Sequence, residues 1–241
     1  MKKNILFLAT VILFISCEKY AEPVAIITPS TGKATVQFFN AAVGTGKNLV
    51  YIDTKLLNKT LLNTNTVLPT NTMGYEVISG SHDLAVRDTT AGSLQSFLGF
   101  IHNFEANSSY TTFMYNNFSA IKQLTIKNNF VFPSDTVSLL RFANFLYNTT
   151  PLTGVDVYSV KKASNIFTNV AQNTVTDYIP YVSIASDTFR IFQTGTSTLI
   201  TSSPASATSF NGFSTTFKRA SSIVLSGMST GTKTLSGFAQ R

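Results

Sequence analysis

One internal repeat constrains the fold of this chain more than any other feature. Four short segments recur once, in the same order. The pairs are 35–41 with 139–145, 49–54 with 156–161, 82–88 with 187–193, and 104–113 with 217–226. Apolar residues alternate with polar ones, as Gln37 does between Val36 and Phe38 and Arg141 does in the second copy. A period of two is typical of a strand with one buried face. The repeat therefore predicts two copies of one β-rich unit.

Each copy has room for about seven short strands in roughly 100 residues, the size of a two-sheet immunoglobulin-like sandwich. We therefore predict an all-β chain of two tandem immunoglobulin-like β-sandwich domains, at 33–129 and 136–241. The linker 130–135 contains Pro133 and is expected to limit relative motion of the domains without abolishing it. The chain has no Trp and one Cys, which excludes the antibody-type core of a Trp packed on a disulfide.

The first residues have the parts of an export signal. A basic start is followed by an apolar run from Ile5 to Ile15 and by the small residue Ser16. This run is too short for a transmembrane helix, which needs about 20 apolar residues. The only cysteine, Cys17, comes next. The stretch Phe14–Cys17 resembles the lipobox of bacterial lipoproteins, although that family prefers Leu where Phe14 stands.

The lipobox resemblance implies that a diacylglycerol is attached to Cys17 and that the chain is cleaved in front of it. We therefore predict a lipoprotein signal peptide at 1–16 and a lipidated tether at 17–32, whose Pro and Gly content suits an extended linker. Burying an acyl chain in a membrane contributes about 0.8 kcal/mol per methylene, so the membrane is the expected partner of the lipid-modified Cys17. The expected location is the cell envelope, at the outer membrane of a Gram-negative bacterium. The surface and the periplasmic face both stay open.

Several motifs in the first copy resemble the family catalogued as domain of unknown function 4397. They are Val36 to Ala41, Val50-Tyr51, Tyr75 with Gly80, and Tyr110 to Phe113. In the second copy Phe145 stands in place of the alanine and Ile223 in place of the tyrosine. The resemblance implies tandem immunoglobulin-like sandwiches in exported, often lipid-anchored bacterial proteins, some of them labelled as adhesion proteins. It implies no catalytic residues.

Charge and motifs argue against several classes of function. The net charge is +7, but the basic residues are scattered, and nucleic-acid binding needs a clustered basic face. The two histidines are expected at a hairpin tip (His82) and on an exposed strand face (His102), and they form neither a catalytic triad nor a zinc set. The Ser159-x-x-Lys162 match to serine–lysine enzymes lacks the helical setting of that motif. We therefore expect no cofactor, no metal and no enzymatic activity.

Aromatic residues in two loops are the candidate ligand contacts. They are Tyr115 and Phe118 in 114–118, and Phe145 and Tyr147 in 144–154. Loops held by a rigid scaffold are common binding positions, and an aromatic ring can stack on a sugar. Burial of each ring in the core is the alternative.

Two threonines, Thr89 and Thr136, follow aspartates in tripeptides that resemble an O-glycosylation acceptor of some Gram-negative exporters. The alternative is an ordinary Asp-Thr at a strand end.

These observations favour a lipid-anchored binding or adhesion module of the cell envelope, without catalysis, whose partner is a glycan or an envelope protein. A structural or assembly subunit of an envelope complex is the second hypothesis. A carbohydrate-active enzyme with paired carboxylates is the third.

Overall fold

The computed structural model describes residues 31–70, 74–134, 136–150, 153–182, 187–202 and 218–240. The predicted signal peptide, Cys17 and nearly all of the predicted tether lie outside the described residues. Within these ranges the chain forms strands β1 to β18 and one short 3-10 helix, η1, and it contains no α-helix. The prediction of an all-β chain is therefore confirmed.

The strands β1 to β9 form a sandwich of two mostly antiparallel sheets, which we call domain 1. Its outer sheet has the order β3 (Lys55–Leu56), β2 (Asn48–Ile52), β6 (Gly80–Asp88) and β7 (Leu98–Phe104). Its inner sheet has the order β4 (Val67–Leu68), β1 (Lys33–Asn40), β8 (Ser109–Tyr115) and β9 (Lys122–Asn128), and β5 (Tyr75–Ile78) also pairs with β1. The helix η1 (Phe118–Ala120) connects β8 to β9.

The strands β10 to β18 repeat this topology in domain 2. The outer sheet has the order β12 (Ser164–Val170), β11 (Val155–Ser159), β15 (Phe189–Gln193) and β16 (Leu199–Ser202). The inner sheet has the order β13 (Thr174–Val175), β10 (Val137–Asn144), β17 (Ala220–Gly227) and β18 (Lys233–Ala239), with β14 (Ile179–Val182) also on β10. In both domains the central pair of the inner sheet is parallel, β1 with β8 and β10 with β17.

Strand register tests the internal repeat residue by residue. Val50 pairs with Val86. Val157, the residue equivalent to Val50 in the second copy, pairs with Ile191, as the aligned segments require. The last segment pair differs, because Val36 lies opposite Tyr110 whereas Leu140 lies opposite Ser221.

The residue equivalent to Tyr110 is therefore Ser221, and the alignment of Tyr110 with Ile223 is wrong by two residues. The shared Ser-Ser dipeptide misled the alignment. A slip of two leaves every side chain on the same face, so alternation could not reveal the error.

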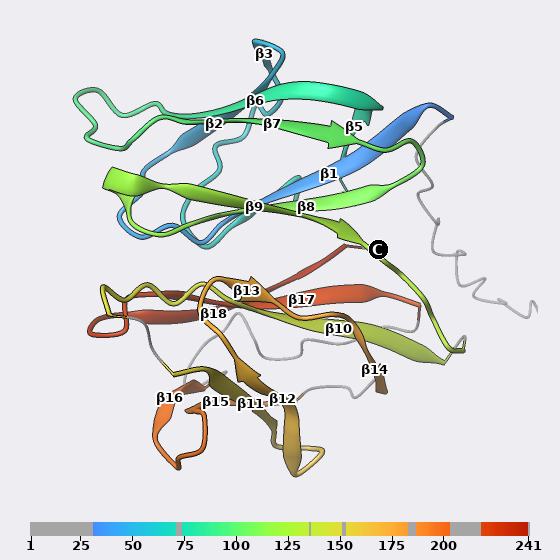
Figure 1. Ribbon diagram of the computed structural model, residues 1–241, viewed down its shortest axis with the longest axis vertical. Coiled ribbons are helices and arrows are strands. Elements are labelled where there is room, and N and C mark those ends of the chain that lie inside the picture. The colour runs from blue at the N-terminus through green and yellow to red at the C-terminus, as the bar shows by residue number, and fades with distance from the viewer. Residues whose placement is uncertain are drawn as a thin grey trace, which may run out of the picture.

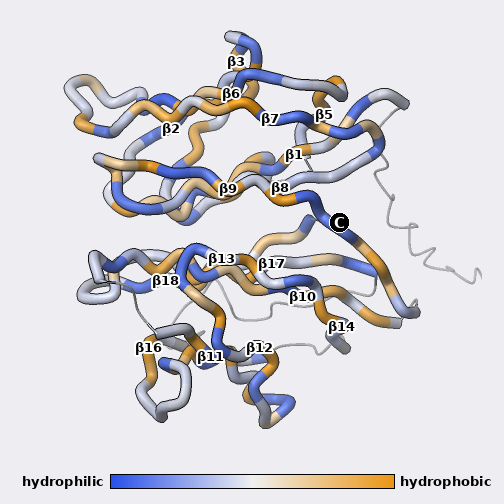
Figure 2. The backbone as a smooth tube through the Cα atoms, viewed as in Figure 1, coloured by the Kyte–Doolittle hydropathy of each residue, from blue (hydrophilic) through white to orange (hydrophobic). Residues whose placement is uncertain are grey.

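Each sandwich has its own apolar core. Phe38, Val50 and Leu84 are at most 2% exposed and lie in the core of domain 1, between its two sheets. Phe142, Val157 and Ile191 are fully buried in the core of domain 2. Figure 2 shows hydrophobic residues spread along the strands of all four sheets.

A third apolar cluster joins the two domains. It consists of Phe39, Ala41, Phe113, Ala143, Phe145, Val224 and Phe238, which are all nearly fully buried. Figure 1 shows the resulting four layers, with the inner sheets facing each other and the outer sheets at the two ends. A large apolar interface favours a fixed arrangement of two domains. The limited relative motion expected from the linker stays a prediction.

The interface also buries the polar residues of the repeat. Gln37 and Arg141 are 2% and 1% exposed, although alternation predicts that they lie on the wet face of a half-buried strand. The Gln37 side-chain amide donates a hydrogen bond of 3.1 Å to the carbonyl of Ala239 in the other domain. The expectation failed because the second face of the inner sheet is covered by the second domain.

Candidate functional site

The structure corrects the prediction of Phe145 as a ligand contact. Phe145 is 1% exposed, and its ring centroid lies 5.1 Å from that of Phe113 in the cluster between the domains. Tyr115 stacks on Phe145 at 5.1 Å and is also packed against this cluster. The alternative of burial holds for this pair, because the second domain covers the end of β8.

Phe118 and Tyr147 are half-buried at the same end of the interface. The Asn117 side-chain amide donates to the Tyr147 hydroxyl at 3.4 Å. The Phe118 ring packs over Gly44, where an added Cβ would lie 2.9 Å from the ring. The structure therefore brings the two predicted loops together, and Phe118 and Tyr147 contact other residues of the protein.

Both candidate glycosylation residues are exposed. The Thr89 hydroxyl donates to the carbonyl of Lys47 at 2.9 Å, and the Thr136 hydroxyl lies 3.1 Å from that of Ser134. Their glycosylation stays a prediction.

His82 lies within β6 and not at a hairpin tip. Its ring nitrogens lie 2.6 Å from an Asp53 carboxylate oxygen and 2.7 Å from the carbonyl oxygen of Ile78. Hydrogen bonds from His82 and from the backbone N–H of Asp83 lower the pKa of Asp53. His82 therefore ties the turn after β2 to the β5–β6 hairpin.

His102 pairs with His82 across β6 and β7, and it faces inward where an exposed face was expected. Its ring packs edge-on against Phe104 and Tyr110, and its Nε2 is buried with no hydrogen-bond partner in the described part of the chain. Burial lowers the pKa of His102. No group of three metal-binding side chains occurs among the described residues.

Ser159 and Lys162 belong to a structural cluster in domain 2. The buried Ser159 and Tyr181 hydroxyls both donate to the Asp187 carboxylate. The Lys162 ammonium lies 4.3 Å from the centre of the Tyr181 ring. Burial raises the pKa of Tyr181, so its hydroxyl keeps the proton that it donates. Ser159 is enclosed and is not positioned as a nucleophile.

An open groove of about 570 Å³ lies on the outer face of the domain 1 outer sheet. Its floor follows from strand register, because Tyr51, Ala85 and Gly99 form one row across β2, β6 and β7. Ala85 has only a methyl group and Gly99 has no side chain, so together they leave a trough beside the Tyr51 ring. An added Cβ at Gly99 would lie 2.6 Å from the Phe97 ring, so Phe97 leans over the glycine.

Arg87 connects the two aromatic sides of the groove. Its guanidinium carbon lies 5.6 Å from the centre of the Tyr51 ring and 5.5 Å from that of Phe97. Cation–π contacts at exposed sites contribute about 0.5–1 kcal/mol, enough to bias the rotamers of these side chains. Phe97 nevertheless remains 63% exposed, so its ring is available to a ligand.

The other end of the groove is polar. Asp83 and Thr54 line it, and Asp53 and Thr54 have the positive φ angles of a two-residue hairpin turn between β2 and β3. Ile101, which is 70% exposed, adds an apolar wall on β7. The groove therefore offers two aromatic rings, one cation and one carboxylate on a rigid sheet.

Domain 2 does not repeat the groove. Register places Arg190 opposite Tyr158, where domain 1 has Ala85 opposite Tyr51. Phe192 stands where domain 1 has Arg87, and it contacts Tyr158 edge-on at 6.3 Å. A large side chain thus occupies the floor position in the second copy.

None of the aromatic residues predicted from the sequence lines this groove. The available signal was a small outward-facing residue beside an exposed aromatic, as in Phe97 and Gly99. That signal becomes specific only once β6 and β7 are in register, since Ala85 belongs to a different strand.

Among the described residues no helix is long and apolar enough to span a membrane. Neither a scan of protein-family models nor a search of curated proteins finds a match to this chain. The resemblance to domain of unknown function 4397 therefore stays a prediction.

Proposed function

We propose that the protein is a lipid-anchored binding module of the bacterial cell envelope and that the outer groove of domain 1 holds a carbohydrate. The observation that carries this proposal is the row of Tyr51, Ala85 and Gly99 with Phe97 and Arg87 above it. The lipid anchor and the envelope location are inferred from the export signal and Cys17 in the sequence.

The chemistry of the groove suits a sugar. One face of a pyranose ring carries C–H groups that stack on an aromatic ring, and Phe97 and Tyr51 supply such rings at the two sides. Arg87 donates to ring hydroxyls and Asp83 accepts from them, which gives orientation in an otherwise apolar trough. The open shape suits a segment of a glycan chain.

The other chemistry-bearing side chains favour binding over catalysis. His82 is engaged by Asp53 and Ile78, and Ser159 is enclosed with Asp187. These groups are used to hold turns and strands together.

A glycan array with the purified full chain tests the proposal. Tyr51→Ala and Phe97→Ala should each weaken binding to the preferred glycans about tenfold or more, because each removes a stacking face. Tyr158→Ala is the matched control, since it removes the equivalent tyrosine of domain 2, and it should bind like the native chain. Equal binding by Tyr51→Ala, Phe97→Ala and the native chain would exclude the groove as the glycan site.

An assembly role is the second candidate, and one surface feature favours it. Phe97 and Ile101 are 63% and 70% exposed and line the same groove, and exposed apolar side chains that lie together are typical of protein interfaces. In that case Phe97→Ala would abolish co-purification of an envelope protein, and no glycan would be bound by the native chain.

A further inference from the structure

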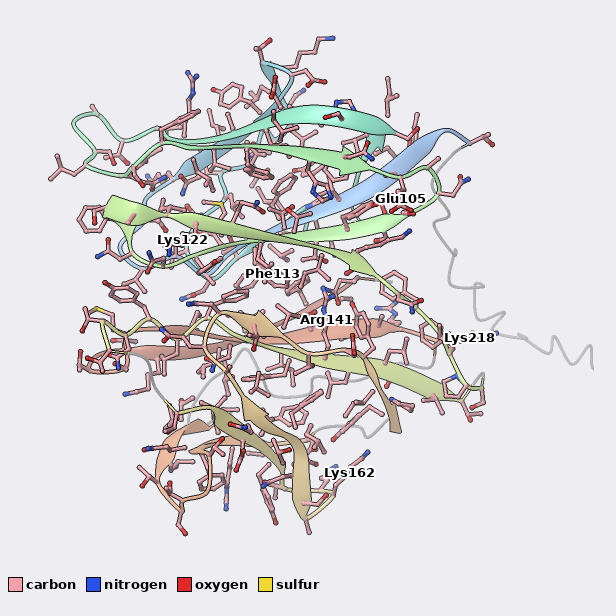
Figure 3. All side chains as sticks on the ribbon, in the orientation of Figure 1. Glu105, Phe113, Lys122, Arg141, Lys162 and Lys218 are labelled. Carbon is pink, nitrogen blue, oxygen red and sulfur yellow. The ribbon has the colours of Figure 1, made fainter. Side chains whose placement is uncertain are left out.

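A second hollow lies between the two domains. This crevice, of about 290 Å³, is lined by Lys127 and Asn129 at the end of β9 and by residues 175–178 of domain 2. Arg141 of β10 lines it as well, and Figure 3 shows this side chain near Phe113 between the inner sheets. The outer groove of domain 1 shares no lining residue with it.

Arg141 is a buried cation with incomplete hydrogen bonding. Its Nε donates to the Ser222 hydroxyl at 2.7 Å, and its guanidinium carbon lies 4.7 Å and 5.6 Å from the centres of the Tyr178 and Phe113 rings. Its Nη2 is buried and has no hydrogen-bond partner among the described residues. None of the ion pairs formed within the described ranges includes Arg141.

Burying the charged Arg141 side chain without an ion-pair partner lowers the stability of the fold. Burial lowers the pKa of Arg141, but a guanidinium stays charged in proteins, so the side chain cannot escape the cost by losing its proton. The two aromatic faces compensate part of the charge, and they leave the in-plane N–H donors of Nη2 unsatisfied.

The repeat shows that packing does not require a cation here. Gln37 is the equivalent residue of domain 1, on the matching strand β1, and its amide reaches the carbonyl of Ala239. A neutral side chain thus completes the same position on the other side of the pseudo-symmetric interface. The charge of Arg141 points to a ligand that carries an opposite charge.

We infer that the crevice binds a small hydroxylated carboxylic acid, of the sugar-acid class, with its carboxylate on the guanidinium of Arg141. Arginine matches a carboxylate through parallel N–H donors, and such charge-assisted pairs are among the strongest hydrogen bonds. Nη2 is enclosed in this structure, and the Tyr178 ring lies over the guanidinium, so a carboxylate would reach Nη2 only with an outward shift of this ring.

The rim fits the rest of such a ligand. Lys127, whose ammonium pairs with Glu105 at 2.5 Å, has further N–H donors at the mouth, while Asn129 and the exposed Asp177 are available for hydroxyl groups. The polar wall and the volume suit one sugar ring, because pockets for small molecules begin at about 300 Å³.

Calorimetric titration of the full chain with D-glucuronate tests this inference, with the uncharged methyl glucoside as the ligand control. We expect saturable binding of glucuronate that is at least tenfold tighter than any binding of the glucoside, because only glucuronate carries the carboxylate that Arg141 would hold. Arg141→Gln, which installs the residue found at position 37, should weaken binding at least tenfold. Lys122→Gln removes an equal charge from the other end of β9 and should bind like the native chain.

Two further variants keep the test decisive. In the Phe97→Ala chain, which lacks one ring of the outer groove, glucuronate should still bind more tightly than the glucoside, so a failure of the outer groove is distinguishable from a failure of this crevice. If Arg141→Gln does not fold, Lys127→Gln at the exposed mouth should still weaken binding two- to threefold at low salt. Absent glucuronate binding, equal binding of the glucoside, or unchanged affinity in the Arg141 and Lys127 variants would overturn the inference.

Discussion

Phe39 of β1 and Phe238 of β18 stack across the interface between the domains, with ring centroids 5.2 Å apart and planes inclined by 16°. Phe113 contacts both rings from β8. The two inner sheets thus meet through aromatic side chains, and this contact turns a tandem repeat into a four-layer body.

Removing one of these rings should destabilise the protein strongly. Phe39→Ala deletes a side chain that is 1% exposed, and we expect the free energy of unfolding to fall by about 3–5 kcal/mol. Denaturant unfolding followed by circular dichroism measures this. Phe97→Ala removes an exposed ring and its contact with Arg87, and it should change stability by no more than about 1 kcal/mol. Similar losses in both variants would contradict a stabilising interface.

Asp53 should make part of the stability dependent on pH. Its pKa in the folded protein lies below the ordinary value of 3.8, chiefly because of the hydrogen bond with His82. A depressed carboxylate pKa contributes stability above the unfolded pKa, and that contribution is lost as the pH falls through the folded pKa. Asp53→Asn should therefore flatten the loss of stability below about pH 4.

Urea unfolding over a series of acidic pH values provides the measurement for Asp53. His82→Gln removes the main hydrogen-bond partner and should flatten the same acid limb. An unchanged slope in both variants would show that this contact does not shift the pKa of Asp53.

Gly99 should control the shape of the outer groove. A methyl group there meets the Phe97 ring at 2.6 Å, and because Phe97 is exposed the ring can swing away at little cost. Gly99→Ala should thus shift the Phe97 ring resonances and weaken glycan binding several-fold, with stability nearly unchanged. Gly231→Ala is the control, since its nearest neighbour would be 3.4 Å away. A native Phe97 spectrum in Gly99→Ala would refute the proposed contact.

Cys17 should decide where the protein resides. The native chain should partition with membranes, and Cys17→Ser should be lost from that fraction because no acyl chain can be attached. Protease treatment of intact cells then reports the membrane face. Cleavage of the native form places the domains on the surface, and protection until the outer membrane is opened places them in the periplasm. Identical fractionation of both forms would exclude the lipid anchor.

The fold class followed from the sequence because alternation is a local signal. Segments such as 35–41 and 139–145 carry the period of a strand in the residues themselves, and their order along the chain predicts two similar sandwiches. The first three repeat pairs also gave the correct strand equivalences, since Val50 and Val157 hold the same place in register with their partners.

Which side of a strand meets water depended on contacts far away in the chain. The sequence determined that Gln37 and Arg141 each lie on the strand face opposite to the neighbouring apolar residues. The tertiary structure decided that this face is buried by the other domain. The same burial removed Phe145 from the candidate contacts, and register alone placed Ala85 beside Gly99 to open the outer groove. Alternation separates two faces of a strand, whereas the cover of each face comes from sheets that are distant in sequence and assemble only in the folded chain.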